Sequence, residues 1–325
     1  MTTTNITNTH NTTDLVGTEA AWGPRIVRPA EAGVSASAEG LREYLLGTDP
    51  GGLLVESRAV VFRGFGVSTE TYDAVADLLL PDRLAYVHGN SPRTKVGRNL
   101  YTSTEYPAEF EISMHNEMSY AHAWPSRILF FCDIAAATGG ATPVVDGKLW
   151  LDSIDPKVRA AFAPGVRYTQ NLHDGMGFGK SWQSTFETDD RAEVEAFLDG
   201  AEAEWNWQPD GTLRVTQVRR ATLSHPVTGT EVWFNQADQW HTAGLGEDAA
   251  ALAEIVPEDE LPQNAYFADG SPIPAEYITH VQEVGMKVAV NVDWEAGDLL
   301  FVDNVAVAHG RRAFTGQRRI LVAMS

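Results

Sequence analysis

Two residues of this sequence, His115 and Glu117, are well suited to hold a metal because they lie two positions apart. In a β-strand, side chains two apart point to the same face, so this imidazole and this carboxylate can reach one ion. A third ligand must come from elsewhere, and His309 lies where a predicted strand ends and a glycine-containing turn begins. Two histidines and one carboxylate on one face of an octahedron are the ligand set of non-haem iron(II) oxygenases.

The open face of such a site accepts the two donor atoms of a 2-oxo acid and then dioxygen. When that acid is 2-oxoglutarate, a second carboxylate lies at its far end, where a guanidinium can bind it through two parallel hydrogen bonds. Arg318 and Arg319 begin the last predicted strand, shortly after His309. Strand alternation lets one of the two face the interior easily. Without the metal ligands, a pair of surface arginines would be the preferred interpretation.

The elements that must position these residues follow from apolar periodicity and turn residues. Helices are predicted at 35–46, 70–80, 189–204 and 274–288, and as a pair within 149–162. Strands are predicted at 59–66, 127–135, 142–146, 213–218, 231–235, 298–303 and 319–324. Short strands with helices inserted or packed outside predict a mixed α/β fold. Its core is expected to be a double-stranded β-helix (jelly-roll, cupin-like) decorated by helices.

The net charge of −20 and a pI near 4.7 argue against two classes of partner. Nucleic-acid binding needs a basic face that neutralises phosphates, and the sequence has no cluster of lysine and arginine that forms one. The same charge disfavours docking on an anionic membrane surface, and no apolar run is long enough to span a bilayer.

Residues 1–20 are predicted to be a disordered leader, and 21–325 a single domain. The leader is polar and rich in threonine and asparagine, without the basic and apolar regions of a signal peptide. Cys132 is the one cysteine and lies in an apolar run, so we expect a buried thiol and no intrachain disulfide. A reducing cytoplasm is therefore the expected location.

Five stretches together resemble the taurine dioxygenase (TauD/TfdA) family, and within it the SyrP-like amino-acid hydroxylases of natural-product pathways. They are TSTEYP (102–107), HNEMSYAHAWP (115–125), GGATP (139–143), VWFNQ (232–236) and DNVAVAHGRRAFTGQRRIL (303–321). The resemblance runs from about residue 59 to the C-terminus, and the combination is far more specific than any one motif.

The resemblance implies iron(II), 2-oxoglutarate and dioxygen as co-substrate. His115, Glu117 and His309 would be the iron ligands. Thr142 would hydrogen-bond the distal carboxylate of 2-oxoglutarate, and Arg319 would form the salt bridge to it, with Arg318 as the alternative if the register is shifted by one. Many family members have Asp where this chain has Glu117. The SyrP-like and clavaminate-synthase-like members also use Glu, and the iron halogenases of this class lack the carboxylate.

The implied activity is hydroxylation of an unactivated C–H bond of an amino acid or a derivative, free or tethered to a carrier protein. Desaturation, epoxidation or another oxidative outcome is the alternative within the same chemistry. Candidate substrate-binding residues lie beside the motifs: Tyr106, Asn116, Met118, Asn235, Gln236 and Arg312. Glu105 and Asp238 are candidates to hold an amine. For each of these residues, ordinary structural satisfaction or surface exposure is the competing interpretation.

Two interpretations from other classes stay open. A non-enzymatic cupin-like metal-binding protein would need the His/Glu/His set but neither Thr142 nor an anchoring arginine. A zinc hydrolase is compatible with two histidines and a glutamate. However, the usual zinc-protease motif places its histidines four apart on a helix, and that spacing is absent. The sequence does not give the oligomeric state.

Overall fold

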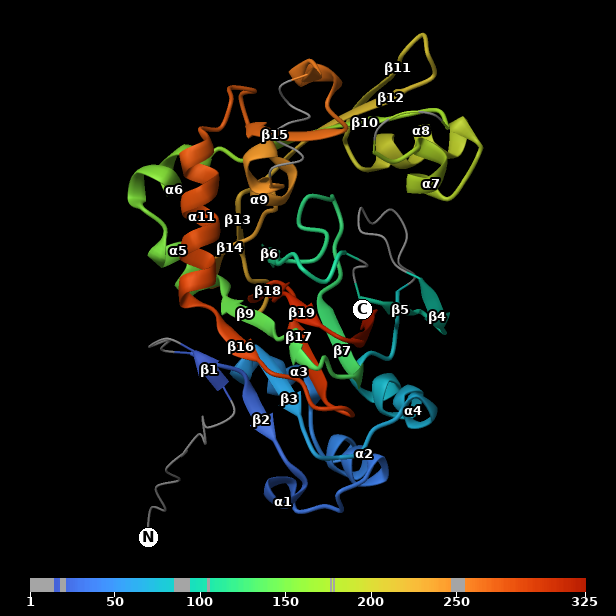
Figure 1. Cartoon of the computed structure of the whole chain (residues 1–325), viewed down its shortest axis with the longest axis vertical. Coiled ribbons are helices and arrows are strands. Elements are labelled where there is room, and N and C mark those ends of the chain that lie inside the picture. The colour runs from blue at the N-terminus through green and yellow to red at the C-terminus, as the bar shows by residue number, and fades with distance from the viewer. Residues whose placement is uncertain are drawn as a thin grey trace.

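The computed structural model describes residues 15–17, 22–84, 94–103, 106–175, 177, 179–246 and 255–325. Two β-sheets face each other in the middle of the molecule, helices cover their outer faces, and a third sheet lies at one end (Figure 1).

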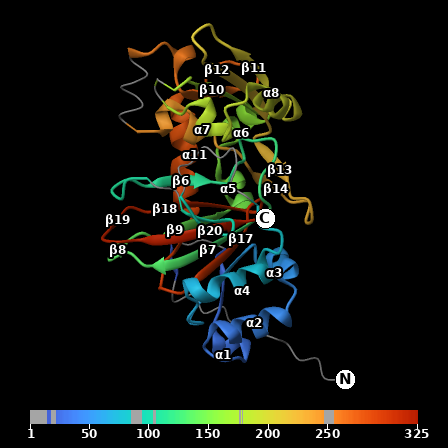
Figure 2. The ribbon, with the colours of Figure 1, turned by 90° about the vertical axis from the view of Figure 1, so that its right-hand side faces the viewer.

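The larger sheet has seven strands, in the order β2-β3-β17-β7-β20-β5-β4. Their bounds are Arg25–Val27 (β2), Ala59–Phe62 (β3), Leu299–Asp303 (β17), Arg127–Ile134 (β7), Arg319–Met324 (β20), Leu100–Thr102 (β5) and Lys95–Gly97 (β4). Four helices lie on its outer side (Figure 2): α1 (Pro29–Ala32), α2 (Ala38–Leu46), α3 (Pro50–Ser57) and α4 (Thr69–Leu79).

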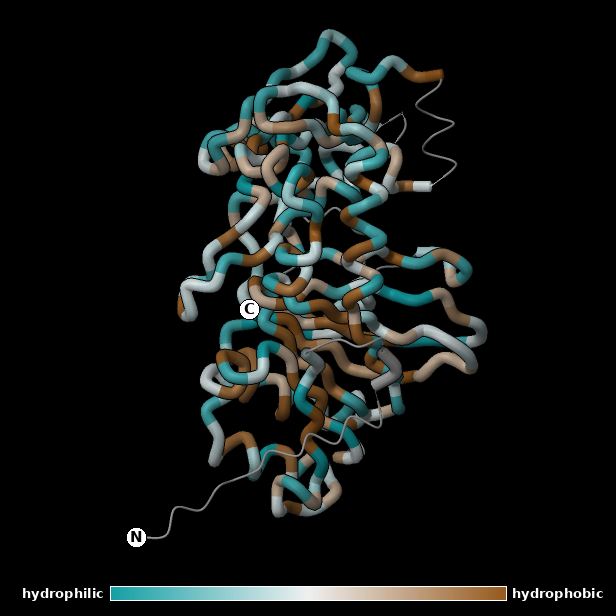
Figure 3. Tube along the Cα trace, turned by 90° about the vertical axis from the view of Figure 1, so that its left-hand side faces the viewer, coloured by the Kyte–Doolittle hydropathy of each residue, from teal (hydrophilic) through white to brown (hydrophobic). Residues whose placement is uncertain are grey.

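Strand alternation divides the side chains of this sheet between two cores. In β3, Val60 and Phe62 pack toward the helices, whereas Ala59 and Val61 face the second sheet. The same alternation holds in β7 and β20. Because both faces are buried, these strands are apolar along their whole length, and Figure 3 shows the hydrophobic colour concentrated in the middle strands and the helices beneath them.

The smaller sheet has five strands, in the order β1-β16-β9-β18-β6. Their bounds are Leu15–Gly17 (β1), Val290–Val292 (β16), Thr142–Asp146 (β9), Val307–Arg311 (β18) and Ile112–His115 (β6). Val144 and Val307 from this sheet share a buried core with Phe130 and Val322 of the larger one. Helices α5 (Gly147–Ser153) and α11 (Ala275–Val288) cover the other face, and the indole N–H of Trp150 joins them by donating to the Val281 carbonyl.

A long insertion after α5 builds the far end of the molecule, at the top of Figure 1. Its sheet has the order β11-β12-β10-β15. The elements are α6 (Pro156–Phe162), β10 (Val166–Leu172), α7 (Trp182–Phe186), α8 (Arg191–Gly200), β11 (Glu204–Trp207), β12 (Leu213–Arg219), β13 (Thr222–Ser224), β14 (Glu231–Trp233), α9 (Ala237–Trp240), the 3-10 turns η1 (Thr242–Gly244) and η2 (Glu258–Glu260), and β15 (Gln263–Phe267). A separate pair, β8 (Thr138–Gly139) and β19 (Phe314–Thr315), lies beside the smaller sheet.

Several predicted elements are confirmed. Strands β9 and β20 have the predicted bounds, and α4 begins after Ser68, which forms a capping box with Thr71. The predicted helix at 189–204 is too long: α8 ends at Gly200, because the chain turns through a left-handed Glu202 (φ 53°) into β11.

The predicted disordered leader and the predicted buried cysteine can each be compared with the structure. Leu15–Gly17, within the predicted disordered leader, forms β1 and pairs with β16, while residues 1–14 and 18–20 lie outside the described residues. Cys132 is fully buried, and this burial raises the pKa of its thiol to about 12. Within the described part of the chain, no helix combines the length and apolar character needed to cross a membrane.

Candidate metal centre

His115 and His309 are brought together by the pairing of β6 with β18. They are direct partners in this antiparallel ladder, and their ring centroids lie 4.4 Å apart. The donor atoms of His115, Glu117 and His309 all lie within 4.8 Å of one another. All three side chains are buried. The structure thus places the three predicted ligands in one group.

Glu117 reaches this group by a route that strand alternation does not describe. Strand β6 ends at His115, so Glu117 lies in the turn that follows. The next residue, Met118, has φ 58°, a left-handed backbone conformation that is uncommon for a residue other than glycine. The expectation that one strand carries both ligands is therefore wrong, although the two side chains converge.

The ring of His115 is oriented by its neighbours. Its Nδ1 lies 2.9 Å from the Ser113 carbonyl oxygen, which can only accept, so Nδ1 carries the proton. The Nε2 lone pair is then available to a metal, as in most histidine-ligated sites. The Gln239 amide nitrogen donates to the same Ser113 carbonyl at 3.1 Å, beside the ring.

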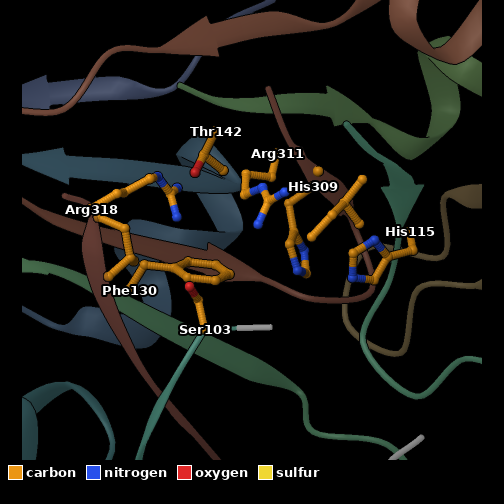
Figure 4. Close-up of a pocket in the computed structure, with 10 residues that line it drawn as sticks. Ser103, His115, Phe130, Thr142, His309, Arg311 and Arg318 are labelled. Carbon is orange, nitrogen blue, oxygen red and sulfur yellow. The ribbon is translucent and has the colours of Figure 1, made fainter. Parts of the chain in front are cut away.

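A pocket of about 380 Å³, its opening included, lies beside the two histidines between the sheets (Figure 4). Its lining residues are Ser103, Ile112, His115, Phe130, Thr142, His309, Gly310, Arg311, Arg318 and Ile320. Thr142 is buried, and its hydroxyl oxygen accepts a hydrogen bond from the Trp294 indole N–H at 3.0 Å, which leaves the hydroxyl proton available to a ligand.

Of the two adjacent arginines Arg318 and Arg319, Arg318 lines this pocket. Its Nε donates to the Gly140 carbonyl at 3.0 Å, and burial lowers the pKa of its guanidinium to about 10, helped by the charge of Arg311. Arg319 is exposed and its Nη1 lies 3.2 Å from the Asp133 carboxylate. The preference for Arg319 is thus corrected: even-numbered residues of β20, such as Ile320, face the second sheet, and Arg318 shares their side.

Arg311 is a second pocket arginine, and the sequence analysis missed it. It lies two residues after His309 in β18, so strand alternation points both side chains to the same face. Its guanidinium donates to the carbonyls of Tyr106 (2.8 Å), Pro107 (2.6 Å) and Phe110 (2.8 Å). Its spacing of two residues from His309 is the sequence signal that could have identified Arg311 as a pocket residue. We call residues 106–110, held in this way, the lip of the pocket.

Most of the predicted substrate-binding residues have structural partners. The amides of Asn116, Asn235 and Gln236 are buried and donate to backbone carbonyls. Arg312 follows the last residue of β18, and its guanidinium contacts Glu111 and Asn291, so it does not line the pocket.

The remaining described candidates lie on the lip, in the turn after β6 and in the core. Tyr106 is exposed on the lip, with its ring 5.9 Å from that of Phe110. Met118 is half-buried in the turn after β6. Asp238 is fully buried, and Glu105 lies outside the described residues.

The residues present suit an iron(II) ion. Two imidazole nitrogens and one carboxylate oxygen converge in a buried group, which is the donor set of the two-histidine, one-carboxylate facial triad. The partly buried guanidinium of Arg318 suits a carboxylate, because a desolvated charge needs a partner of opposite sign.

Comparisons with known proteins agree with this geometry. The family model for "Taurine catabolism dioxygenase TauD, TfdA family" matches residues 46–324. The chain is 36% identical over 275 residues to the dapdiamide synthesis protein DdaC of Enterobacter agglomerans, covering 84% of this chain and 83% of that protein. It is 32% identical over 284 residues to a clavaminate synthase-like protein of Arabidopsis thaliana, covering 84% and 82%.

Two solved structures share the fold. One is PvcB of Pseudomonas aeruginosa, described as an Fe, alpha-ketoglutarate dependent oxygenase from an isonitrile synthetic pathway. Its TM-score is 0.51 at 14% identity, covering 95% of this chain and 90% of PvcB. The other is an asparagine oxygenase in complex with Fe(II), 2S,3S-3-hydroxyasparagine and succinate, with a TM-score of 0.52 at 14% identity, covering 88% and 82%.

The family-model match runs through both sheets, the three clustered ligands and Arg318, and the two curated relatives each align with 84% of the chain. This chain therefore belongs to the taurine catabolism dioxygenase TauD, TfdA family.

Proposed function

We propose that this iron(II)- and 2-oxoglutarate-dependent oxygenase hydroxylates an unactivated C–H bond of an amino acid or an amino-acid derivative. His115, Glu117 and His309 hold the iron, and Thr142 and Arg318 hold the distal carboxylate of 2-oxoglutarate. One observation carries the proposal: a buried His/Glu/His group lies beside a pocket that also contains the partly buried guanidinium of Arg318.

When bound, iron(II) supplies the activation of dioxygen, and 2-oxoglutarate supplies two electrons as it is converted to succinate and carbon dioxide. The protein residues bind 2-oxoglutarate and orient it. Arg318 attracts the distal carboxylate, and the Thr142 hydroxyl donates to it. Phe130 and Ile320 line the pocket, so the ionic contact forms in a low-dielectric environment where it is stronger than in water.

The substrate proposal rests on relatives and on the pocket mouth. The 36% identical relative is named for dapdiamide synthesis, which supports a role in natural-product biosynthesis. The lip carries the exposed rings of Tyr106 and Phe110, and its backbone is bonded to the pocket residue Arg311, so we propose that these rings contact the organic part of the substrate. We propose that this substrate is amino-acid-like and is either free or tethered to a carrier protein. We also infer that the two facing sheets form the predicted jelly-roll.

The test uses the apoprotein under anaerobic conditions, with iron(II) and 2-oxoglutarate added. We expect a weak visible metal-to-ligand charge-transfer band in the wild type, and no band in His115→Ala. The wild-type preparation is then exposed to air and screened with amino acids for substrate-dependent succinate release and a product heavier by one oxygen atom. A folded, iron-loaded wild type without the band would refute the assigned site. A product lacking two hydrogens would refute hydroxylation.

A further inference from the structure

Asn304 is a fully buried residue in the turn that joins β17 to β18. Its side-chain Oδ1 accepts a hydrogen bond from the Glu117 backbone N–H at 2.8 Å. Its Nδ2 donates to the Glu117 carbonyl at 3.0 Å and to the Pro125 carbonyl at 2.8 Å. One carboxamide therefore satisfies both backbone polar groups of a predicted metal ligand.

These bonds take the place of a strand ladder that stops short of Glu117. The pairing of β6 with β18 includes His115 and His309 but does not extend to Glu117. The left-handed Met118 that follows costs free energy, and such a conformation persists where surrounding contacts hold it. Without the ladder, the contacts to Asn304 fix the backbone from which the Glu117 carboxylate extends.

The turn that carries Asn304 is itself held in place. The Asp303 carboxylate accepts from the backbone N–H groups of Val305 and Ala306, and His225 Nε2 lies 2.9 Å from its other oxygen. The Asn304 backbone also contributes, because its carbonyl accepts from the Asn116 amide at 2.6 Å. These hydrogen bonds thus link the Glu117 segment to the turn that leads into β18, the strand that carries His309.

We propose that Asn304 is a positioning residue for the metal centre: it sets where the Glu117 carboxylate lies relative to the two histidines. This inference rests on the proposed function, since it concerns the same iron site. Asn304 acts through the Glu117 backbone. Its effect should therefore appear in the affinity for the metal.

The test measures the dissociation constant of Fe(II) for the apoprotein by anaerobic titration calorimetry, at a temperature where circular dichroism shows each variant folded. Loss of an outer contact to a metal ligand typically weakens binding about 10- to 100-fold, and we expect this loss for Asn304→Ala. Asn304→Ser retains one hydroxyl donor and adds no charge, so it is the milder variant if the alanine variant does not fold. We expect it also to bind Fe(II) about 10-fold more weakly than the wild type.

Asn235→Ala is the matched control. Asn235 is equally buried and its amide also bonds only to backbone, donating to the Ala221 carbonyl and accepting from the Ala237 N–H, with no contact to a ligand residue. We expect a lower melting temperature for this variant but Fe(II) affinity within about threefold of wild type, since no ligand segment is released.

The outcomes separate the two proposals. If the wild type binds Fe(II) and the folded Asn304 variants bind it with the same affinity, the positioning role is overturned and the proposed function stands. An equal loss of affinity in Asn235→Ala would also overturn it, because the loss would then be general. A wild type that binds no Fe(II) would overturn the proposed function, and the positioning role with it.

Discussion

At the scale of single residues, Arg318 and Arg319 are chain neighbours with opposite surroundings. Arg318 lies in the pocket, and Arg319 is exposed and pairs with Asp133. A hydrogen bond to a charged group contributes about 1.5–3 kcal/mol, so losing the Arg318 anchor weakens binding at least about 10-fold. We expect Arg318→Gln to raise the 2-oxoglutarate dissociation constant by that factor and Arg319→Gln to change it by less than about twofold, since exposed ion pairs contribute little.

Anaerobic titration of the charge-transfer band measures both constants without a known substrate. Equal effects of the two substitutions would show that neither arginine is the specific anchor.

The buried carboxyl of Asp238 makes stability depend on pH. Desolvation raises the pKa of this carboxyl to about 6, although hydrogen bonds from Ser113 and Gln282 act in the opposite direction. Because the folded state holds this proton more tightly than the unfolded state, the contribution of Asp238 is most favourable at low pH. It declines as pH rises from about 4 to 6.

We therefore expect Asp238→Asn to gain stability relative to wild type as pH rises. The difference between the two free energies of unfolding should change by roughly 1–2 kcal/mol between pH 5 and pH 7.5. Urea unfolding of both proteins at the two pH values measures it. A difference independent of pH would show that the Asp238 carboxyl does not titrate in this window.

The sequence allowed the ligand residues to be predicted better than the residues around them. His115 and Glu117 are two apart, which signals a shared site even though a turn, and not a strand, carries Glu117. The choice between Arg318 and Arg319 failed because Ile320, Leu321, Val322 and Ala323 are all apolar. A strand buried on both faces gives no pattern that tells inside from outside.

At the scale of elements, the lip is held by one side chain. The Arg311 guanidinium donates to three of its carbonyls, and the Phe314 N–H donates to a fourth, that of Ala108. A lysine ammonium is a compact charge and lacks the rigid fork that reaches several acceptors.

We expect Arg311→Lys to release the lip, with a loss of at least about 2 kcal/mol of local stability, since each charged hydrogen bond contributes about 1.5–3 kcal/mol. Hydrogen exchange of residues 106–110, followed by mass spectrometry, should accelerate at least about 10-fold. Arg319→Lys is the control, because Arg319 is exposed and pairs with Asp133, and it should leave this segment unchanged. Unchanged exchange in Arg311→Lys would mean that other contacts hold the lip.

Elements with strong local signals were predictable, and short ones were not. Helix α4 has a capping serine and an apolar stripe, so both its type and its start followed from the sequence. Strand β18 has five residues and β16 has three, and such lengths carry too little periodicity to separate a strand from a turn. His309 was therefore expected at a strand end, whereas it lies within β18.

At the scale of the whole molecule, ligands that bind the folded state stabilise it by mass action. Iron(II) with 2-oxoglutarate at about 100 times the dissociation constant adds about 2.7 kcal/mol. We expect the anaerobic melting temperature to rise by several degrees, a rise that a chelator reverses and that His115→Ala lacks. If iron(II) and 2-oxoglutarate leave the melting temperature of the wild type unchanged, binding at this site is contradicted.

The mixed α/β architecture was predictable because apolar strands and amphipathic helices alternate along the chain. Of the third sheet, only β12 was predicted, as a strand at 213–218. Strands β10 and β15 were not, since they carry polar residues such as Gln170 and Asn264 along with their apolar ones. Pairing over long sequence separations also leaves no local trace, and the adjacency of β3 and β17 is one example.

That adjacency has a consequence for biosynthesis. The partner of β3 is β17, and β17, β18 and β20 all follow the long insertion in the chain. While a ribosome is still making the insertion, β3, β7 and β9 have emerged without the neighbours that later complete their ladders. Until those neighbours are made, the apolar faces and unpaired edges of these strands are exposed, which is the condition that favours aggregation. His115, Glu117 and His309 can therefore come together only after β18 has been synthesised and has paired with β6.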